Sequence, residues 1–186
     1  MEKYLRRVIT FDEKLHFSYK ITSERDNENS EKLQSFIKNT PRPFDRNTTE
    51  GHVTATAFII DESRSFALMI FHRKLNMWLP PGGHCDENSN VFSTAFREAT
   101  EETGIQTLNA YSHEIYDIDI HTIPENKKEP EHLHYDVRLL FTADTNAPLK
   151  LNEDETSGVE WILIDELEKY NQLPSVLILK NKLEVI

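Results

Sequence analysis

Three glutamates lie close together in one short stretch of this sequence, and their spacing suits a divalent cation. Glu98, Glu101 and Glu102 fall within an arc of about 100° if the stretch is helical. Like charges at these spacings cost about 0.2–0.5 kcal/mol per pair, so the grouping is unfavourable unless a cation lies against it. The three carboxylates therefore indicate a metal site, whereas the simpler interpretation is an acidic helix face in water.

A pair of glycines precedes these glutamates. Gly82 and Gly83 follow a short apolar segment, and Arg97 stands beside Glu98. A glycine pair alone indicates only a turn. Mg²⁺, however, typically combines a few carboxylates with water and substrate phosphate. A glycine loop with accessible carbonyls facing the three glutamates could therefore complete such a site.

The elements that must position these residues can be predicted from periodicity. Residues 90–102 have a helical period, and Gly104 follows as a helix-ending signal. Strands are predicted at 53–60, 65–71, 77–79, 112–121, 132–143 and 159–164, and helices at 165–172 and 175–182. This order favours an α/β or α+β sandwich, with helices on both sides of a mixed β-sheet.

The first 48 residues differ in character from the rest. Segment 23–40 is strongly polar, and its few apolar residues stand at helical spacing: Leu33, Phe36 and Ile37. Two prolines then end any helix. We predict a helical N-terminal extension over residues 1–48 that packs on a main domain of residues 49–186. Whether the extension mediates a homodimer is left open.

Composition excludes several classes of protein. The 186 residues include 21 Lys and Arg against 32 Asp and Glu, a net charge of −11, which argues against a partner that is an extended nucleic acid. The longest apolar run, residues 66–71, is far shorter than the ~18 residues that cross a membrane. The first twenty residues show no secretory signal. The single cysteine, Cys85, excludes an internal disulfide, and we expect a cytoplasmic protein.

The stretch from Gly83 to Ile105 resembles the Nudix box. That box is a glycine, five residues, a glutamate, seven residues, and then Arg-Glu-hydrophobic-x-Glu-Glu-x-Gly-hydrophobic. Eight residues fall in register: Gly83, Arg97, Glu98, Ala99, Glu101, Glu102, Gly104 and Ile105. Ser89 stands where the box has its first glutamate. The resemblance covers about residues 44–170, and 131–136 resembles a bacterial branch whose substrates are mostly unassigned.

The resemblance implies a Nudix-like α/β/α sandwich and a metal-dependent hydrolase. Its reaction would be attack of water on phosphorus in a nucleoside diphosphate linked to a further group, a small-molecule partner. Glu98, Glu101 and Glu102 would bind Mg²⁺, with Mn²⁺ as an alternative. The carbonyl of Gly82 or Gly83 would complete the coordination, and the neighbouring Arg97 would orient Glu98.

The general base is a separate question, because Ser89 has no carboxylate. Glu98 and Glu102 qualify by their position on the helix. Nudix proteins often place another glutamate on the loop before the final strand. In the acidic loop 151–157 we prefer Glu155 for this role, and the simpler interpretation is a solvated loop. Two further expectations concern the box helix: Asp86 or Glu87 would pair with Arg97, and Ser89 or Asn90 would cap the helix.

Several side chains are candidates for binding the substrate. His132 and His134 alternate, so a strand would place both on one face, and with His84 and His121 they could line a phosphate or sugar pocket. The simpler interpretation is a polar strand face, and the spacing does not support a zinc site. Arg73 and Lys74 precede the glycine loop and are either phosphate contacts or exposed turn charges.

Other functions compete with hydrolysis. A catalytically silent module that binds or senses a nucleotide is favoured by Ser89 and opposed by the intact glutamates. Isomerisation of an isoprenoid diphosphate commonly uses a cysteine and a glutamate about the allylic carbon, and the position of Cys85 in the glycine loop argues against it. RNA decapping rests on analogy alone, and the net charge opposes a long RNA footprint.

Overall fold

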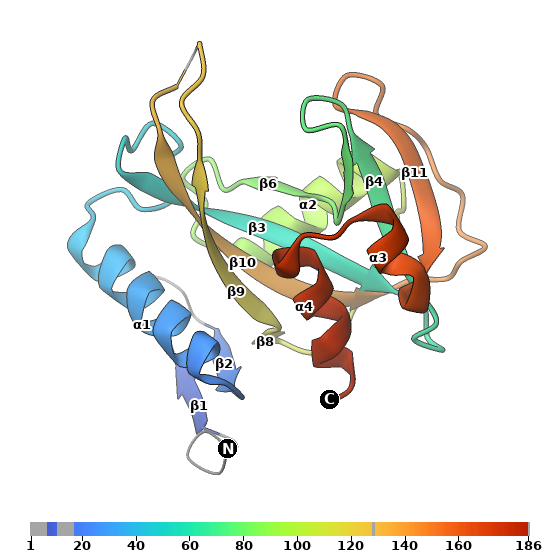
Figure 1. Ribbon diagram of the computed structural model, residues 1–186, viewed down its shortest axis with the longest axis horizontal. Helices are drawn as coiled ribbons and strands as arrows, with labels where there is room; N and C mark the ends of the chain where they lie inside the picture. Colours follow the sequence, from blue (N-terminus) through green and yellow to red (C-terminus); the bar gives the residue numbers. More distant parts are fainter. Residues whose placement is uncertain (1–6, 11–16, 128, 186) are drawn as a thin grey trace. The chain divides into compact units, whose positions relative to one another are not determined.

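The computed structural model describes residues 7–10, 17–127 and 129–185. The chain forms two compact units that interleave along the sequence: residues 1–55, 83–94 and 113–139 form the first, and residues 56–82, 95–112 and 140–186 the second. Figure 1 labels most of the helices and strands, coloured along the sequence. Among the described residues, none of the helices has the length and apolar character needed to span a membrane. The predicted absence of a secretory signal falls partly outside the described ranges.

The first unit combines short strands with one long helix. Its elements are β1 (Arg7–Thr10), β2 (Ser18–Ile21), α1 (Glu24–Asn39), the first half of β3 (Gly51–Ile60), β8 (Glu114–Ile115), β9 (Asp117–Ile123) and most of β10 (His132–Thr142). β2 pairs antiparallel with β1 and parallel with β8, and β9 pairs antiparallel with β10. The buried core of this unit includes Tyr19, Ile21, Leu33, Ile37, Ile118 and Val137.

Helix α1 confirms the helix predicted before the two prolines. Ser23 caps its first turn, because the Ser23 hydroxyl accepts a hydrogen bond of 3.1 Å from the Asp26 amide. Leu33 and Ile37 are buried one helical turn apart, as the apolar spacing predicts. The same N-terminal region also holds β1 and β2, which the sequence analysis did not predict. The domain boundary after residue 48 stays a prediction.

The second unit is built on antiparallel neighbours. β11 (Thr156–Leu163), β4 (Phe66–His72), the second half of β3, the end of β10 and β7 (Asn109–Ala110) follow one another across its sheet, and β5 (Met77–Leu79) pairs with β4. A 3₁₀ turn over 164–166, α3 (Leu167–Tyr170) and α4 (Pro174–Leu183) complete it. β3 and β4, which confirm the strands predicted at 53–60 and 65–71, pair antiparallel.

The pairing of β3 with β10 makes the sheet mixed. Within the first unit, the Leu133 amide donates to the Glu50 carbonyl, and within the second the Ala143 amide donates to the Ile60 carbonyl. Because both hydrogen bonds have the same sequence offset, β10 runs parallel to β3. β4 runs antiparallel to β3. These pairings confirm an α/β fold with a mixed sheet.

Helix α2 (Val91–Thr103) carries the predicted glutamates. Asn90 caps it, since its side-chain oxygen accepts a hydrogen bond of 3.1 Å from the Ser93 amide. Ala95 and Ala99 are fully buried on the predicted apolar face. The helix ends before Gly104, whose φ of +78° lies in the left-handed region that glycine adopts without strain. The predicted helix and its end are confirmed.

Candidate metal and active site

The three glutamates of α2 do not share one environment. Glu98 and Glu102 are buried, at 9% and 3% exposure, whereas the Glu101 side chain is half exposed. The interpretation of a solvated acidic face is therefore wrong for two of the three. Burying two carboxylates one turn apart is unfavourable unless each is compensated.

Glu102 is held by the glycine segment of its own unit. The Gly82 amide donates a hydrogen bond of 2.9 Å to the Glu102 carboxylate. Burial nevertheless raises the pKa of Glu102 to about 8, and the negative charges of Glu98 and Glu155 act in the same direction. In the metal-free protein this carboxylate therefore resists ionisation below about pH 8.

Arg97 compensates the other two glutamates. Its guanidinium lies 2.8 Å from the Glu98 carboxylate and 2.9 Å from that of Glu101. Burial raises the pKa of Glu98, and the positive charge of Arg97 opposes that rise. Asp86 and Glu87 were predicted to pair with Arg97, but each forms an ion pair within the first unit instead. Glu87 pairs with Arg42, and Asp86 lies 3.9 Å from Arg46.

Glu155 lies at the end of the acidic loop, immediately before β11. Its negative charge raises the pKa of both Glu98 and Glu102, so the structure brings this carboxylate near the α2 glutamates within the second unit. The side-chain amide of Asn152 donates a hydrogen bond of 3.3 Å to the Glu155 carboxylate. Arg73 holds the same loop, because its amide donates to the Glu155 carbonyl and its Nε to the Thr156 carbonyl. Lys74 is exposed.

The remaining residues of the box belong to the segment before α2. Gly82, Gly83 and His84 form the short strand β6 rather than an irregular loop. Ser89 is exposed, and its carbonyl accepts a hydrogen bond from the Val91 amide, while the capping role falls to Asn90. Gly83, His84 and Ser89 lie in the first unit, and Gly82 in the second.

A cavity of about 530 Å³ lies beside Glu101 in the second unit. Its lining also includes Gln106, Lys150 and Asn152. Lys150 was not predicted from the sequence, because a single lysine between Leu149 and Leu151 belongs to no recognisable motif. The cavity places one cation and two amide side chains next to an exposed metal-ligand candidate.

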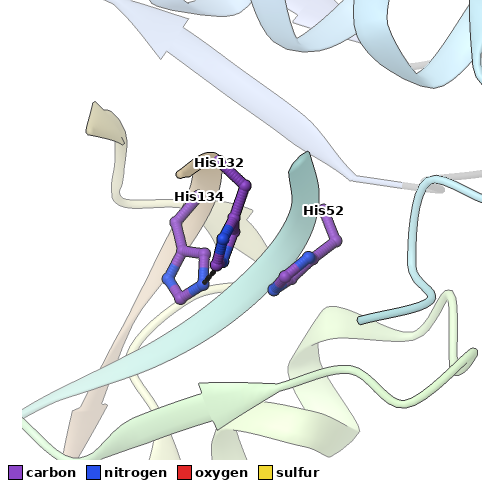
Figure 2. Close-up of side chains that lie close together, drawn as sticks. All are labelled: His52, His132 and His134. Atoms are coloured by element: carbon purple, nitrogen blue, oxygen red, sulfur yellow. Dashed lines mark hydrogen bonds between the residues drawn. The ribbon is translucent and has the colours of Figure 1, made fainter. Parts of the chain in front are cut away.

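The predicted histidine pair lies in a larger cluster within the first unit (Figure 2). The Nε2 atoms of His132 and His134 are 3.3 Å apart, and the ring of His52 lies 5.0 and 4.7 Å from theirs, centre to centre. His84 and His121 are also next to His134, at 5.3 and 5.5 Å. The structure thus brings together the four predicted histidines and adds His52.

Two histidines of the cluster, His52 and His134, have lowered pKa values. Burial, with the neighbouring imidazoles, lowers the pKa of His134 to about 2. Burial also lowers the pKa of His52, and the nearby His132 adds to this, although the Thr48 backbone opposes it. Both rings are therefore neutral at pH 7. Neither buried ring nitrogen of His52 has a hydrogen bond of normal geometry.

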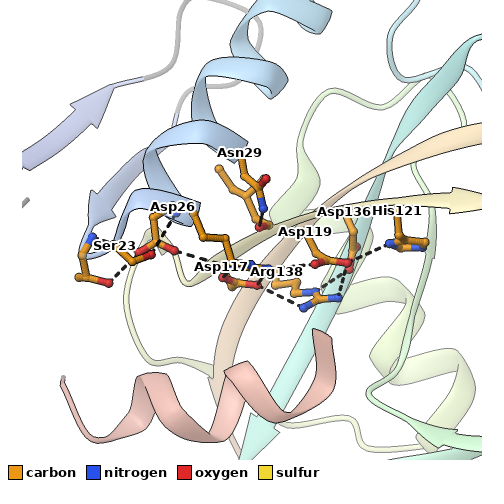
Figure 3. A network of polar contacts seen from close by, with 11 residues as sticks. Ser23, Asp26, Asn29, Asp117, Asp119, His121, Asp136 and Arg138 are labelled. Carbon is orange, nitrogen blue, oxygen red and sulfur yellow. Dashed lines mark hydrogen bonds and ion pairs between the residues drawn. The ribbon is translucent and has the colours of Figure 1, made fainter. Parts of the chain in front are cut away.

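Next to the histidines, a buried ion-pair network joins α1, β9 and β10 (Figure 3). The Arg138 guanidinium contacts Asp136 at 2.8 Å, Asp117 at 3.2 Å and Asp119 at 3.3 Å, while Arg25 of α1 contacts Asp117 at 2.8 Å. Burial favours the neutral form of Asp119. The hydrogen bond from His121 and the charge of Arg138 outweigh burial and hold the pKa of Asp119 well below its usual range.

Comparison with known proteins agrees with this fold and with the glutamate motif. Residues 50–179 match the NUDIX domain. The asymmetrical bis(5'-nucleosyl)-tetraphosphatase of Rattus norvegicus is 29% identical over 101 residues, which cover 54% of this chain and 65% of that protein. The chain thus matches slightly less than two thirds of that curated relative.

Solved structures show the same fold at low sequence identity. A C. elegans Ap4A hydrolase binary complex superposes with a TM-score of 0.51 at 17% identity, covering 72% of this chain and 95% of that one. The E. coli dihydroneopterin triphosphate pyrophosphohydrolase gives a TM-score of 0.55 at 14% identity, covering 70% and 92%.

Taken together, the mixed sheet, the glutamate-bearing helix and the match over residues 50–179 define the class of this protein. The chain belongs to the NUDIX domain family.

Proposed function

We propose that this protein is a metal-dependent hydrolase that cleaves the phosphoanhydride of a nucleoside diphosphate linked to another group. The observation that carries this proposal is the set of carboxylates gathered in the second unit, where Glu98 and Glu102 are buried and the charge of Glu155 acts on both. Membership in the NUDIX domain family supports the same activity.

The donor set fits a hard divalent cation. Glu98, Glu101 and Glu102 would hold Mg²⁺ or Mn²⁺ through carboxylate oxygens, with a carbonyl of Gly82 or Gly83 as a further ligand. The raised pKa of Glu102 marks a carboxylate whose ionised form lacks a counter-charge in the metal-free protein. A bound divalent ion would neutralise the diphosphate and acidify a water molecule.

The protein's own side chains would then position the reacting groups. Arg97 bridges Glu98 and Glu101 and so fixes the direction in which both carboxylates point. Glu155 is our candidate for the general base, because its charge acts on both buried glutamates and a carboxylate at that place can take a proton from water. Glu98 and Glu102 are the alternatives for this role.

The substrate is proposed to be a small nucleotide derivative. The rat relative is a bis(5'-nucleosyl)-tetraphosphatase and the C. elegans structure is an Ap4A hydrolase, so a dinucleoside polyphosphate is the first compound to test. Lys150 in the cavity beside Glu101 is a candidate phosphate contact. Arg73, Lys74, His84, His132 and His134 stay predictions for substrate binding. We further propose the cytoplasm as the location, since a sequence with a single cysteine can form no internal disulfide.

The proposal is tested by turnover of a panel that includes a bis(5'-nucleosyl) tetraphosphate, nucleotide sugars and nucleoside triphosphates, with and without Mg²⁺. We expect Mg²⁺-dependent product release that Glu101→Gln abolishes without unfolding the protein. The half-exposed side chain makes this variant safe for the fold. Thr107→Ala, an exposed change just beyond α2, serves as the control. Nucleotide binding without turnover would instead establish the silent sensor module.

A second variant addresses the missing glutamate of the box. Ser89 is exposed, so Ser89→Glu introduces a carboxylate without disturbing packing. If the rate of Ser89→Glu exceeds that of the natural protein, the serine limits catalysis. An unchanged rate would show that the base lies elsewhere, and Glu155→Gln would then be expected to lower kcat by about 10²–10⁴-fold.

A further inference from the structure

The histidine cluster of the first unit offers nitrogen ligands, which the carboxylate site proposed on α2 does not use. His52 is buried, with 2% of the residue exposed. Neither of its ring nitrogens has a hydrogen bond of normal geometry. Burying an imidazole in this way costs free energy unless a partner compensates it. A ligand that accepts nitrogen lone pairs would supply that partner.

Two strands place three such nitrogens together. His52 stands on β3, and His132 and His134 stand on one face of β10 (Figure 2). One ligand nitrogen from each of the three lies within 4.8 Å of the other two. The antiparallel β9–β10 pair and the β3–β10 contacts fix both strands, so the three side chains project from a rigid part of the sheet.

The orientation of His132 is set by its other nitrogen. The Nδ1 of His132 lies 2.8 Å from the Pro130 carbonyl, which can only accept, so Nδ1 carries a proton and Nε2 is the nitrogen left for a metal. The lone pair of its Nε2 then points at His134. A backbone carbonyl that fixes the tautomer of a coordinating histidine is the usual arrangement around protein-bound metals.

The separation of the two facing nitrogens also fits a metal. The Nε2 atoms of His132 and His134 are 3.3 Å apart. Two nitrogens bound at about 2.0–2.1 Å to a tetrahedral Zn²⁺ ion lie about 3.3–3.4 Å apart. Imidazole nitrogens suit Zn²⁺, Cu²⁺, Fe²⁺ or Ni²⁺, whereas Mg²⁺ takes oxygen ligands.

We propose that His52, His132 and His134 form a transition-metal site of the zinc type, distinct from the divalent-cation site on α2. Three protein ligands leave the fourth position of a tetrahedral ion open to water or to a ligand. The ring of His84 lies 5.0 Å from that of His52, centre to centre. The spacing of these residues in sequence carried no such signal, because His52 comes from another strand.

The test uses the full-length protein, stripped of metal and titrated with Co²⁺ and Zn²⁺ alone. We expect one equivalent of Co²⁺ to give the intense visible absorption of a four-coordinate, nitrogen-bound ion, and Zn²⁺ to displace it. Octahedral coordination by carboxylate oxygens gives only weak bands. The spectrum should persist in Glu101→Gln, so failure of this proposal and failure of the hydrolase proposal are distinguishable.

Variants locate the site. His134 is half-buried, and we expect His134→Asn to fold and to weaken Zn²⁺ binding by about a hundredfold or more, since losing an outer partner alone costs about 10–100-fold. His113→Asn is the matched control, because His113 is exposed and lies in the same unit. Imidazole nitrogen NMR shifts of the natural protein provide a second readout that needs no variant.

Two results would overturn the assignment. One is that the natural protein binds no Co²⁺ or Zn²⁺, or that all of the Co²⁺ or Zn²⁺ binding is lost in Glu101→Gln. The other is Zn²⁺ binding that His134→Asn leaves unchanged while the imidazole resonances of the cluster do not shift.

Discussion

Replacement of Glu102 by glutamine should make the metal-free protein more stable at alkaline pH than the natural protein. Burial raises the pKa of this carboxyl from its ordinary 4.5 to about 8. A raised folded-state pKa means that stability is fully present below pH 4.5 and is lost as pH rises toward 8. At about 1.4 kcal/mol per pKa unit, the full loss is about 5 kcal/mol, of which about 3 kcal/mol falls between pH 5.5 and 9.

Glu102→Gln removes this loss while it keeps an oxygen that can accept the hydrogen bond from the Gly82 amide. The assay is urea unfolding in EDTA at pH 5.5 and pH 9 for both proteins, because other titrating groups are common to the two and cancel in the difference. Thr107→Ala is the control, since it is an exposed change that adds and removes no titrating group, so its difference from the natural protein should be the same at both pH values. Adding Mg²⁺ at pH 9 should restore stability to the natural protein and much less to Glu102→Gln.

The reasoning is refuted if the difference in unfolding free energy between Glu102→Gln and the natural protein is the same at both pH values. Glu102 would then ionise as easily in the folded protein as in the unfolded chain. The buried carboxylates would in that case have a compensating group other than a metal ion.

Two further predictions concern the scaffold. Arg138→Met should destabilise the protein by about 3–5 kcal/mol in urea unfolding, because it leaves three buried aspartates without the cation that they share. Arg46→Met, a change at an exposed arginine, is the control and should change stability by less than about 0.5 kcal/mol. Gly104→Ala should lower the thermal midpoint and cost about 2 kcal/mol or more, since a Cβ there would stand 2.5 Å from that of Lys150 at a φ of +78°; a midpoint equal to that of Thr107→Ala would contradict the packing argument.

Local signals made much of the fold predictable from the sequence. The period of 3.6 and the closing glycine predicted α2, because that period reports burial of one helix face. Runs rich in β-branched and aromatic residues on either side of a polar turn predicted β3 and β4, and both strands are buried along most of their length. β1 and β2 were not predicted, since β2 depends on a parallel partner about a hundred residues later: Ser18 faces Glu114. Such a pairing leaves no mark within a short window of sequence.

The candidate site divides in the same way. The α2 glutamates share one helix, so their grouping was visible in sequence, and Arg97 lies among them. Which of them is buried was not visible, because that depends on what the rest of the unit packs over α2. Glu155 could be proposed only by resemblance, and His52 was missed because it joins His132 across two strands. Residues brought together by strand pairing need the register before they can be recognised.

Strand β10 gives one further consequence. Its residues 134, 136 and 138 stand opposite residues 121, 119 and 117 of β9, so alternate positions build one polar ladder from imidazoles at one end to ion pairs at the other. An inserted residue between His134 and Asp136 would turn the imidazole end toward the opposite side while leaving the charged end in place. Substitutions can therefore change the histidine end and the ion-pair end independently, whereas one inserted or deleted residue within this strand would remove a whole end from the shared face.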